Sequence, residues 1–225
     1  MRKILAIFLM LIGIGVVLTP KVIGFKERQE MELEKEEFVK SGSGIERIHE
    51  YEDYQSQINT NSKFISSPEN EDNSYIFNDE ILGYVRIPKI DIDYAIRYGT
   101  TEEVLSRNIG LLENSHLPLG GKGNNTVLVG HRGYAGIHAF FRNANELEYG
   151  DEVIITNPTG ALLYYKVVSS HVVEPDDISL IKLEEDKDKV TLITCHPYMI
   201  NNQRLIVICE RSRWVGSEIN SSCYD

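Results

Sequence analysis

The chain has 225 residues, a net charge of −11 and three cysteines. This length suits one domain of moderate size with appendages. The acidic balance gives no sign of a surface for nucleic acid or anionic lipid, so we expect no nucleic-acid partner. The odd cysteine count leaves at least one thiol free or paired between molecules.

The N-terminal region is apolar. Arg2 and Lys3 precede an uncharged run over residues 4–18, and apolar character continues to Phe25. Crossing a bilayer takes about 20 residues, and the two basic residues favour a cytoplasmic N-terminus. No small-x-small cleavage site follows. We therefore expect residues 1–25 to be an uncleaved single-pass anchor in the cell membrane, with the rest of the chain outside the cell; a cleaved signal peptide is the alternative.

A connecting region follows at residues 26–80. Residues 26–40 alternate acidic and basic side chains, which is typical of a solvated helix, and the Ser-Gly repeat at 41–44 interrupts it. Apolar residues return at helical spacing between 45 and 58, and a stretch rich in Asn, Ser, Glu and Asp leads to residue 80. We interpret the whole region as a helical stalk and polar linker.

The folded domain is predicted over residues 81–211, followed by a polar C-terminal tail at 212–225. Thr101 has N-cap chemistry for a short helix ending near residue 107. About eight short strands with two or three short helices predict a mainly β fold, closed into a barrel. The segments are strands near 81–88, 90–96, 126–129, 151–156, 162–173, 190–195 and 204–210, a helix at 139–147, a polar loop at 174–189 and a further segment from Gly110.

One stretch near the end of the chain carries the chemistry. A β-branched run places Cys195 at the exposed end of a strand. A turn through Pro197 follows, and Arg204 opens the return strand, which brings it back beside the cysteine. A thiol and a guanidinium facing one cleft suit acyl transfer, because the thiolate attacks a carbonyl and the cation meets the oxyanion. Cys209 lies in an apolar run and is expected to be a buried small residue; the role of Cys223 stays open.

The sequence Thr-Leu-Ile-Thr-Cys at 191–195 resembles the Thr-Leu-x-Thr-Cys signature of sortases, the cysteine transpeptidases of Gram-positive cell surfaces. The continuation through Pro197-Tyr198, Asn201 and Arg204-Leu205 resembles most closely the class C, pilin-assembling branch. The histidine of the family is similar to His131, in Val-Gly-His-Arg-Gly at 129–133. The resemblance covers roughly residues 80–211.

This resemblance implies an eight-stranded β-barrel, which the expected N-terminal membrane helix would precede, and a catalytic set of His131, Cys195 and Arg204. His131 would act as general acid and base, and Arg204 would bind the oxyanion. Thr194 and His196 flank the nucleophile and are expected to contact substrate. No cofactor or metal is expected, since the acidic residues of the 174–189 loop match no calcium-binding spacing.

The implied reaction is cleavage of a Leu-Pro-x-Thr-Gly-like sorting signal between Thr and Gly, through a Cys195 thioester. The expected partners are surface or pilin proteins that carry the signal, and an amine acceptor, either a pilin lysine or the peptidoglycan cross-bridge. A hydrolytic cysteine protease and a non-catalytic exported β-domain are the alternatives.

Two features depart from the family pattern. His196 and Met199 stand where the family has threonine and glycine, which changes the wall of the expected groove. Many class C members also carry an Asp-Pro-aromatic lid over the site, and this chain contains no Asp-Pro pair. The sequence therefore predicts an open site, with residues 41–80 serving as a spacer.

Overall fold

The computed structural model of the chain describes residues 26, 29–40, 48–60, 77, 80–133 and 139–215. The chain divides into two compact units, Met1–Ser41 and Gly42–Asp225.

The described part of the first unit is a helix over residues 29–40, which confirms the helix predicted there. Lys40 Nζ lies 2.9 Å from Glu36 Oε2 one turn earlier, the spacing at which opposite charges meet on a helix. The predicted membrane segment, residues 1–25, lies outside the described residues. Among the helices that are described, none has both the length and the apolar character that a bilayer crossing requires.

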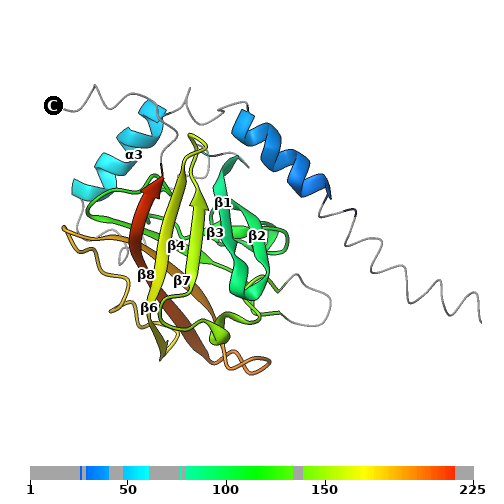
Figure 1. Cartoon of the computed structure of the whole chain (residues 1–225). Coiled ribbons are helices and arrows are strands. Elements are labelled where there is room, and N and C mark those ends of the chain that lie inside the picture. Colours follow the sequence, from blue (N-terminus) through cyan, green and yellow to red (C-terminus); the bar gives the residue numbers. More distant parts are fainter. Residues whose placement is uncertain are drawn as a thin grey trace, which may run out of the picture. The chain divides into compact units, whose positions relative to one another are not determined.

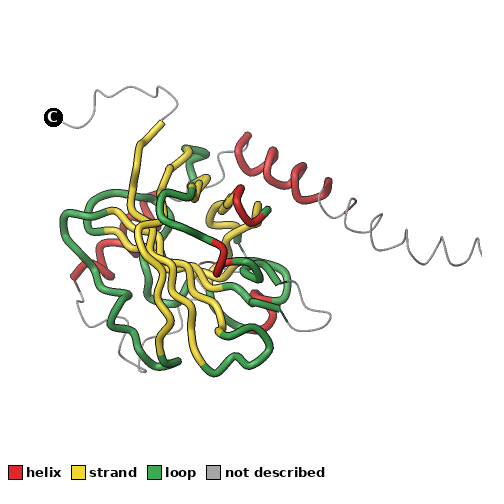
Figure 2. Tube along the Cα trace, turned by 60° about the horizontal axis from the view of Figure 1, so that its bottom comes forward, coloured by secondary structure: helices red, strands yellow, loops and turns green. Residues whose placement is uncertain are grey.

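In the second unit, the described residues form eight strands that close into a barrel in the order β1-β2-β3-β4-β7-β8-β6-β5 (Figure 1). Most neighbours are antiparallel, whereas β2–β3 and β4–β7 are parallel. In Figure 2 the strands run side by side, with loops at their ends. The strands are β1 (Ile81–Ile87), β2 (Ile92–Tyr98), β3 (Ile109–Leu111), β4 (Asn124–Val129), β5 (Glu152–Thr156), β6 (Leu162–Val173), β7 (Asp188–His196) and β8 (Gln203–Val215).

This architecture confirms the mainly β, eight-stranded barrel with few helices. The short 3-10 helix η2 (Pro88–Ile90) joins the first two strands, which pair as the predicted hairpin. The helix α5 (Glu102–Leu105) begins at the predicted cap, where Thr101 Oγ1 accepts a hydrogen bond from the Val104 N–H. Closing the sheet leaves no unpaired strand edge.

Two strands of the barrel, β4 and β7, each contain a run of consecutive buried residues. Asn124 to Leu128 of β4 are buried in succession, as are Lys189 to Leu192 of β7. Parallel strands buried on both faces lack the alternation of half-exposed strands. The two strands that lead to His131 and Cys195 are therefore fixed by packing on both faces.

The helix α3 (Ile48–Thr60) packs on the barrel. Tyr51 and Tyr54 are fully or almost fully buried, and the Tyr54 ring meets Phe77 edge-on at 5.1 Å between centroids. Phe77 in turn stacks on Tyr98 at the end of β2. Gln55 ties the helix to the barrel, because its Oε1 accepts from the Leu117 N–H at 3.0 Å. The helical spacing seen in the connecting region thus corresponds to a helix whose aromatic face joins the core.

One predicted helix was wrong. Residues 139–147 form turns and a short 3-10 helix, η3 (Ala144–Glu146), rather than a continuous helix. The Phe141 N–H donates to the His131 carbonyl at 3.0 Å, so this backbone group serves the neighbouring segment instead of a helical ladder. The side chains expected to be buried in this segment are buried: Phe140, Phe141 and Leu147.

Several strand boundaries also differ from the prediction. β8 continues to Val215, beyond the predicted end at residue 210, because it pairs with β6 as far as the Leu162↔Val215 register. β4 and β7 each begin two residues before the predicted start, at Asn124 and Asp188, which pair with each other. β2 lies at 92–98 instead of 90–96, because η2 occupies residues 88–90.

Candidate active site

The register of three adjacent strands brings together the predicted catalytic residues. β4 and β7 run parallel with Val129 opposite Ile193, so His131 and Cys195 each follow two residues later. The Gly130 N–H donates to the Ile193 carbonyl at 3.2 Å and continues the pairing beyond the end of β4. Neighbouring strands lie about 4.8 Å apart, and equivalent positions share a face. The same register, continued two residues beyond β4, sets position 131 opposite position 195.

Arg204 reaches the same place from the other side of Cys195. In the antiparallel pairing of β7 with β8, Cys195 is directly opposite Arg204. Directly opposite residues have Cβ atoms about 4.5–5.5 Å apart and project from one face. The register therefore pairs Cys195 with Arg204, and the joint catalytic role of these two residues with His131 stays a prediction.

The Arg204 guanidinium is held over the turn between β7 and β8. Its Nη1 donates to the carbonyls of Gln203 at 3.0 Å and Asn201 at 3.3 Å. Within the described part of the chain, its bonds involve this single nitrogen. Nε and Nη2 remain as donors for a substrate oxygen. The bonds from Nη1 to the turn set the orientation of the guanidinium.

His131 is supported by close backbone packing. Gly130 admits the Phe141 ring so closely that a Cβ at this position would lie 2.7 Å from Phe141 Cδ2. The His131 side chain is 26% exposed, and its Nε2 lies 3.2 Å from Glu102 Oε2 on α5. The imidazole therefore has a carboxylate beside its Nε2 atom.

Arg132 is a site residue that the sequence analysis missed. Its side chain is buried, and Nη1 contacts the Cys195 carbonyl at 3.4 Å and His196 Nδ1 at 2.6 Å. Nη2 donates to Asn145 Oδ1 at 2.6 Å, and Nε donates to the Arg142 carbonyl. Burial lowers the pKa of Arg132, while attraction to Cys195 opposes that shift. One buried cation thus joins the segment after β4, the end of β7 and the 142–145 turn.

The contact with Arg132 also fixes the state of His196. A guanidinium can only donate, so Nδ1 of His196 must accept and the ring proton must sit on Nε2. Burial, and secondarily the charge of Arg132, lowers the pKa of His196. His196 is therefore a neutral imidazole beside the nucleophile. Its predicted contact with substrate remains a prediction.

Thr194 is placed differently from a groove residue. Its side chain is only 2% exposed, and Oγ1 donates to the Gly130 carbonyl at 2.8 Å. This bond joins the end of β7 to the residue immediately before His131. Thr194 thus sets the relative position of His131 and Cys195, and its predicted contact with substrate is not tested.

Of the other two cysteines, one lies among the described residues. Cys209 is fully buried and free, which confirms the interior residue predicted there. Burial raises the pKa of its thiol, so it is a poor nucleophile. Cys223 lies outside the described residues.

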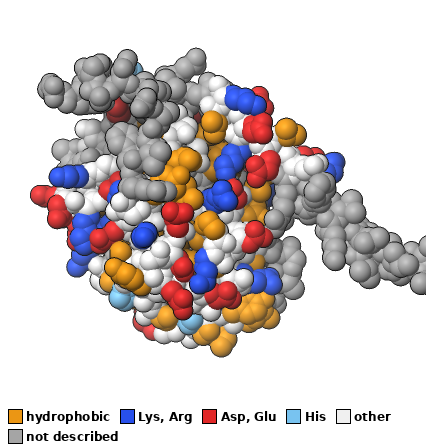
Figure 3. Space-filling model, in the orientation of Figure 1, with side chains coloured by type: hydrophobic (Ala, Val, Ile, Leu, Met, Phe, Trp, Pro, Cys, Tyr) orange, Lys and Arg blue, Asp and Glu red, His pale blue; other side chains and the backbone are white. Residues whose placement is uncertain are grey.

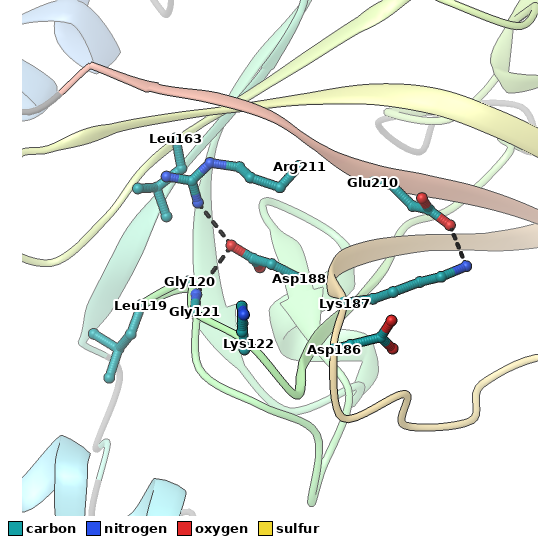
Figure 4. Close-up of a pocket in the computed structure, with 10 residues that line it drawn as sticks. All are labelled: Leu119, Gly120, Gly121, Lys122, Leu163, Asp186, Lys187, Asp188, Glu210 and Arg211. Carbon is teal, nitrogen blue, oxygen red and sulfur yellow. Dashed lines mark hydrogen bonds and ion pairs between the residues drawn. The ribbon is translucent and has the colours of Figure 1, made fainter.

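A pocket of about 500 Å³ lies at the other end of β7 (Figure 4). It surrounds Asp188, which is seven residues before Cys195, or roughly 23 Å along an extended strand. Asp188 Oδ2 accepts from Arg211 Nη1 at 2.8 Å and from the Gly121 N–H at 2.9 Å. Burial nevertheless raises the pKa of Asp188. Two ion pairs, Asp188–Arg211 and Lys187–Glu210, line this pocket, and its distance along β7 makes it distinct from the thiol site.

The acidic loop before β7 is likewise paired with cations. Glu184 lies 2.9 Å from Lys189 and 3.1 Å from Lys187, and Lys187 also reaches Glu210 at 2.7 Å. On the face of the molecule shown in Figure 3, acidic and basic side chains are interspersed. That face carries no broad patch of one sign that would attract a polyanion.

Comparison with known proteins identifies the same region of the chain. A family model described as "Sortase domain" matches residues 85–212. Among curated proteins, sortase D of Bacillus subtilis is 33% identical over 116 residues, which cover 52% of this chain and 54% of the relative. The chain thus matches about half the length of that relative.

Solved structures are similar over a larger part of the chain. Group B Streptococcus Pilus Island 1 sortase C2 has a TM-score of 0.65 and 35% identity, covering 76% of this chain and 98% of that one. Clostridium perfringens sortase C, solved with the C-terminal cell wall sorting motif, has a TM-score of 0.61 and 38% identity, covering 73% of this chain and 90% of that one.

Proposed function

Because the chain belongs to the sortase family, we propose that it is a membrane-anchored cysteine transpeptidase that acts on sorting-signal proteins. The observation that supports this proposal is the strand register, in which Cys195 is opposite Arg204 and the strand beside β7 leads two residues later to His131. The substrate we propose is a Leu-Pro-x-Thr-Gly-like signal. A related sortase C was solved with a C-terminal cell wall sorting motif, which supports this substrate class.

In the first half-reaction the Cys195 thiolate attacks the carbonyl carbon of the substrate threonine. Negative charge develops on the carbonyl oxygen. The Arg204 guanidinium and the backbone N–H of His196 are the proposed hydrogen-bond donors to that oxygen. The Thr–Gly bond then breaks, and the imidazolium of His131 gives its proton to the departing glycine nitrogen. The threonine remains on sulfur as a thioester.

In the second half-reaction an amine, rather than the water used by a hydrolase, attacks the thioester. His131, now neutral, accepts a proton from the incoming amine as its nitrogen attacks the thioester carbonyl. Collapse of the intermediate forms the new amide and returns the Cys195 thiolate beside the imidazolium. We favour a pilin lysine as the acceptor, because similar solved structures are named as pilus sortases; the peptidoglycan cross-bridge is the other acceptor considered.

Cellular location forms part of the proposal. The uncharged run at residues 4–18 and the preceding Arg2 and Lys3 support a single-pass anchor with a cytoplasmic N-terminus and an extracellular barrel. N-terminal sequencing of the mature protein from the membrane fraction tests it. A start near Met1 is expected, whereas a start after residue 20 would establish a cleaved signal peptide.

The reaction is tested by incubating the full-length protein, purified in detergent, with a sorting-signal peptide. Parallel reactions contain no amine, triglycine or a lysine-containing pilin peptide, and products are identified by mass spectrometry. Transfer of the threonine acyl group to an amine is expected, and the amine used identifies the acceptor. Release of free acid that no amine diverts would indicate a protease, and no cleavage at all would indicate a non-catalytic domain.

A further inference from the structure

We propose that Glu102 is a positioning residue for His131, orienting the imidazole and fixing its tautomer. The inference rests on the proposed function, in which His131 exchanges protons with the leaving and incoming amines. Its basis is the 3.2 Å contact between Glu102 Oε2 and His131 Nε2.

The contact has a chemical consequence for the two ring nitrogens. An ionised carboxylate only accepts, so the Nε2 that faces Glu102 must carry a proton. Proton exchange is then left to Nδ1. In the imidazolium both nitrogens are protonated, and Nδ1 gives its proton to the leaving amine. The neutral ring that remains is the Nε2–H tautomer, whose Nδ1 can accept the proton of the incoming amine. Glu102 thus fixes the same tautomer for both half-reactions.

The backbone that carries Glu102 is well fixed. Glu113 holds the residue before the cap, since its Oε1 accepts from the Thr100 N–H at 2.8 Å and its Oε2 from the Thr100 hydroxyl at 2.8 Å. Leu105 of α5 is buried against β3, where a Cβ on Gly110 would lie 2.8 Å from Leu105 Cδ2. The carboxylate therefore extends from a platform whose position does not depend on its contact with His131.

Other charged groups around His131 do not duplicate this contact. Cys195 on β7 and Arg204 on β8 lie on the side of the reacting atoms. Arg132, the next residue along the chain, is directed to the Cys195 carbonyl, His196 and Asn145. Glu102 is thus the negative charge whose contact with the imidazole the structure records.

Because the Glu102 side chain is exposed, an experiment can distinguish a role in positioning His131 from a role in stability. The Glu102 side chain is 71% exposed, and exposed ion pairs contribute little to stability. We therefore expect Glu102→Gln to change the melting temperature by less than about 2 °C. A role in proton transfer would instead appear in the rate and in its dependence on pH.

The experiment compares the full-length protein with Glu102→Gln, Glu102→Asp and the control Glu103→Gln. Glu103 is the next residue of the same helix, is exposed and carries the same charge. Glu102→Gln should lower kcat/KM about tenfold, below the 10²–10⁴ typical of a complete general acid–base contribution. The pH profile of kcat/KM should also change shape, because the neutral ring is no longer held as the Nε2–H tautomer. Glu102→Asp should recover part of both effects, and Glu103→Gln should resemble the wild type.

A second readout does not depend on activity. The ¹⁵N chemical shifts of the His131 ring, assigned by comparison with His131→Ala, report the tautomer directly. The Nε2–H tautomer is expected in the wild type and in Glu103→Gln, and a mixture of the two tautomers is expected in Glu102→Gln. If the wild type cleaves no sorting peptide, the proposed function fails while this measurement still decides the role of Glu102. Unchanged shifts and an unchanged pH profile, or a rise in kcat/KM in Glu102→Gln, would overturn the inference.

Discussion

Replacing Arg132 with methionine tests whether this buried cation holds the active site together. Met has nearly the length of the arginine stem, so the main loss is the guanidinium and its contacts with four acceptors on two other segments. Hydrogen bonds from a charged donor contribute about 1.5–3 kcal/mol each, but they are not additive. Removing the guanidinium also removes the free-energy cost of desolvating its charge, which offsets part of the loss. A net loss of about 3 kcal/mol in the free energy of unfolding is expected.

For a domain of this size, about 3 kcal/mol corresponds to a fall in melting temperature of roughly 6–12 °C. Thermal and urea denaturation followed by circular dichroism measure it, with Arg107→Met as the control, because Arg107 is exposed. At a temperature where the variant is folded, kcat/KM should also fall, since a displacement of about 1 Å near the reacting atoms can cost 10²-fold. A loss below about 1 kcal/mol, equal to that of the control, would refute the role given to Arg132.

The remaining predictions concern the thiols, the guanidinium and one buried histidine. Cys195→Ala should abolish peptide cleavage with little change in melting temperature, and Arg204→Ala should lower kcat/KM by about 10²–10³-fold; retained cleavage in Cys195→Ala would contradict the site. In the folded protein iodoacetamide should label Cys195 and leave Cys209 unmodified, because Cys209 is fully buried; peptide mapping checks this. Burial lowers the pKa of His116 from 6.5 to about 4, so the unfolded chain binds the proton more tightly and stability should decrease as pH falls from about 6.5 towards 4, by up to about 3 kcal/mol. Urea denaturation at pH 7.5 and 4.5 measures this decrease, and a His116→Gln variant with the same decrease would show that another group causes it.

The core of the site could be predicted because it depends on local sequence patterns. A β-branched run ending at Cys195 and a turn leading to Arg204 define an antiparallel pair, and pairing across a short turn fixes which residues face each other. His131 follows another apolar strand at the corresponding position. Strand ends and short turns are properties that the sequence expresses directly.

Contacts between distant segments could not be predicted in the same way. Glu102 meets His131 because β2, α5 and β3 bring the helix to the end of β4. Nothing in the acidic pair at residues 102–103 indicates which carboxylate points to the site. Arg132 reads as an ordinary polar residue, since arginine is mostly exposed, and its burial follows from the 142–145 turn that folds over it. The tyrosines of α3 showed helical spacing, but the partners that bury them come from elsewhere in the chain.

The most direct test of the central claim is the chemical identity of the intermediate on Cys195. The full-length protein is mixed with a sorting-signal peptide in the absence of amine, quenched in acid, digested and mapped by mass spectrometry. We expect the peptide that contains Cys195 to carry an adduct with the mass of the acyl fragment ending in threonine. We expect this adduct to disappear when the accepted amine is added before quenching. Cleavage of the signal without any adduct on Cys195, or an adduct on another residue, would contradict the account.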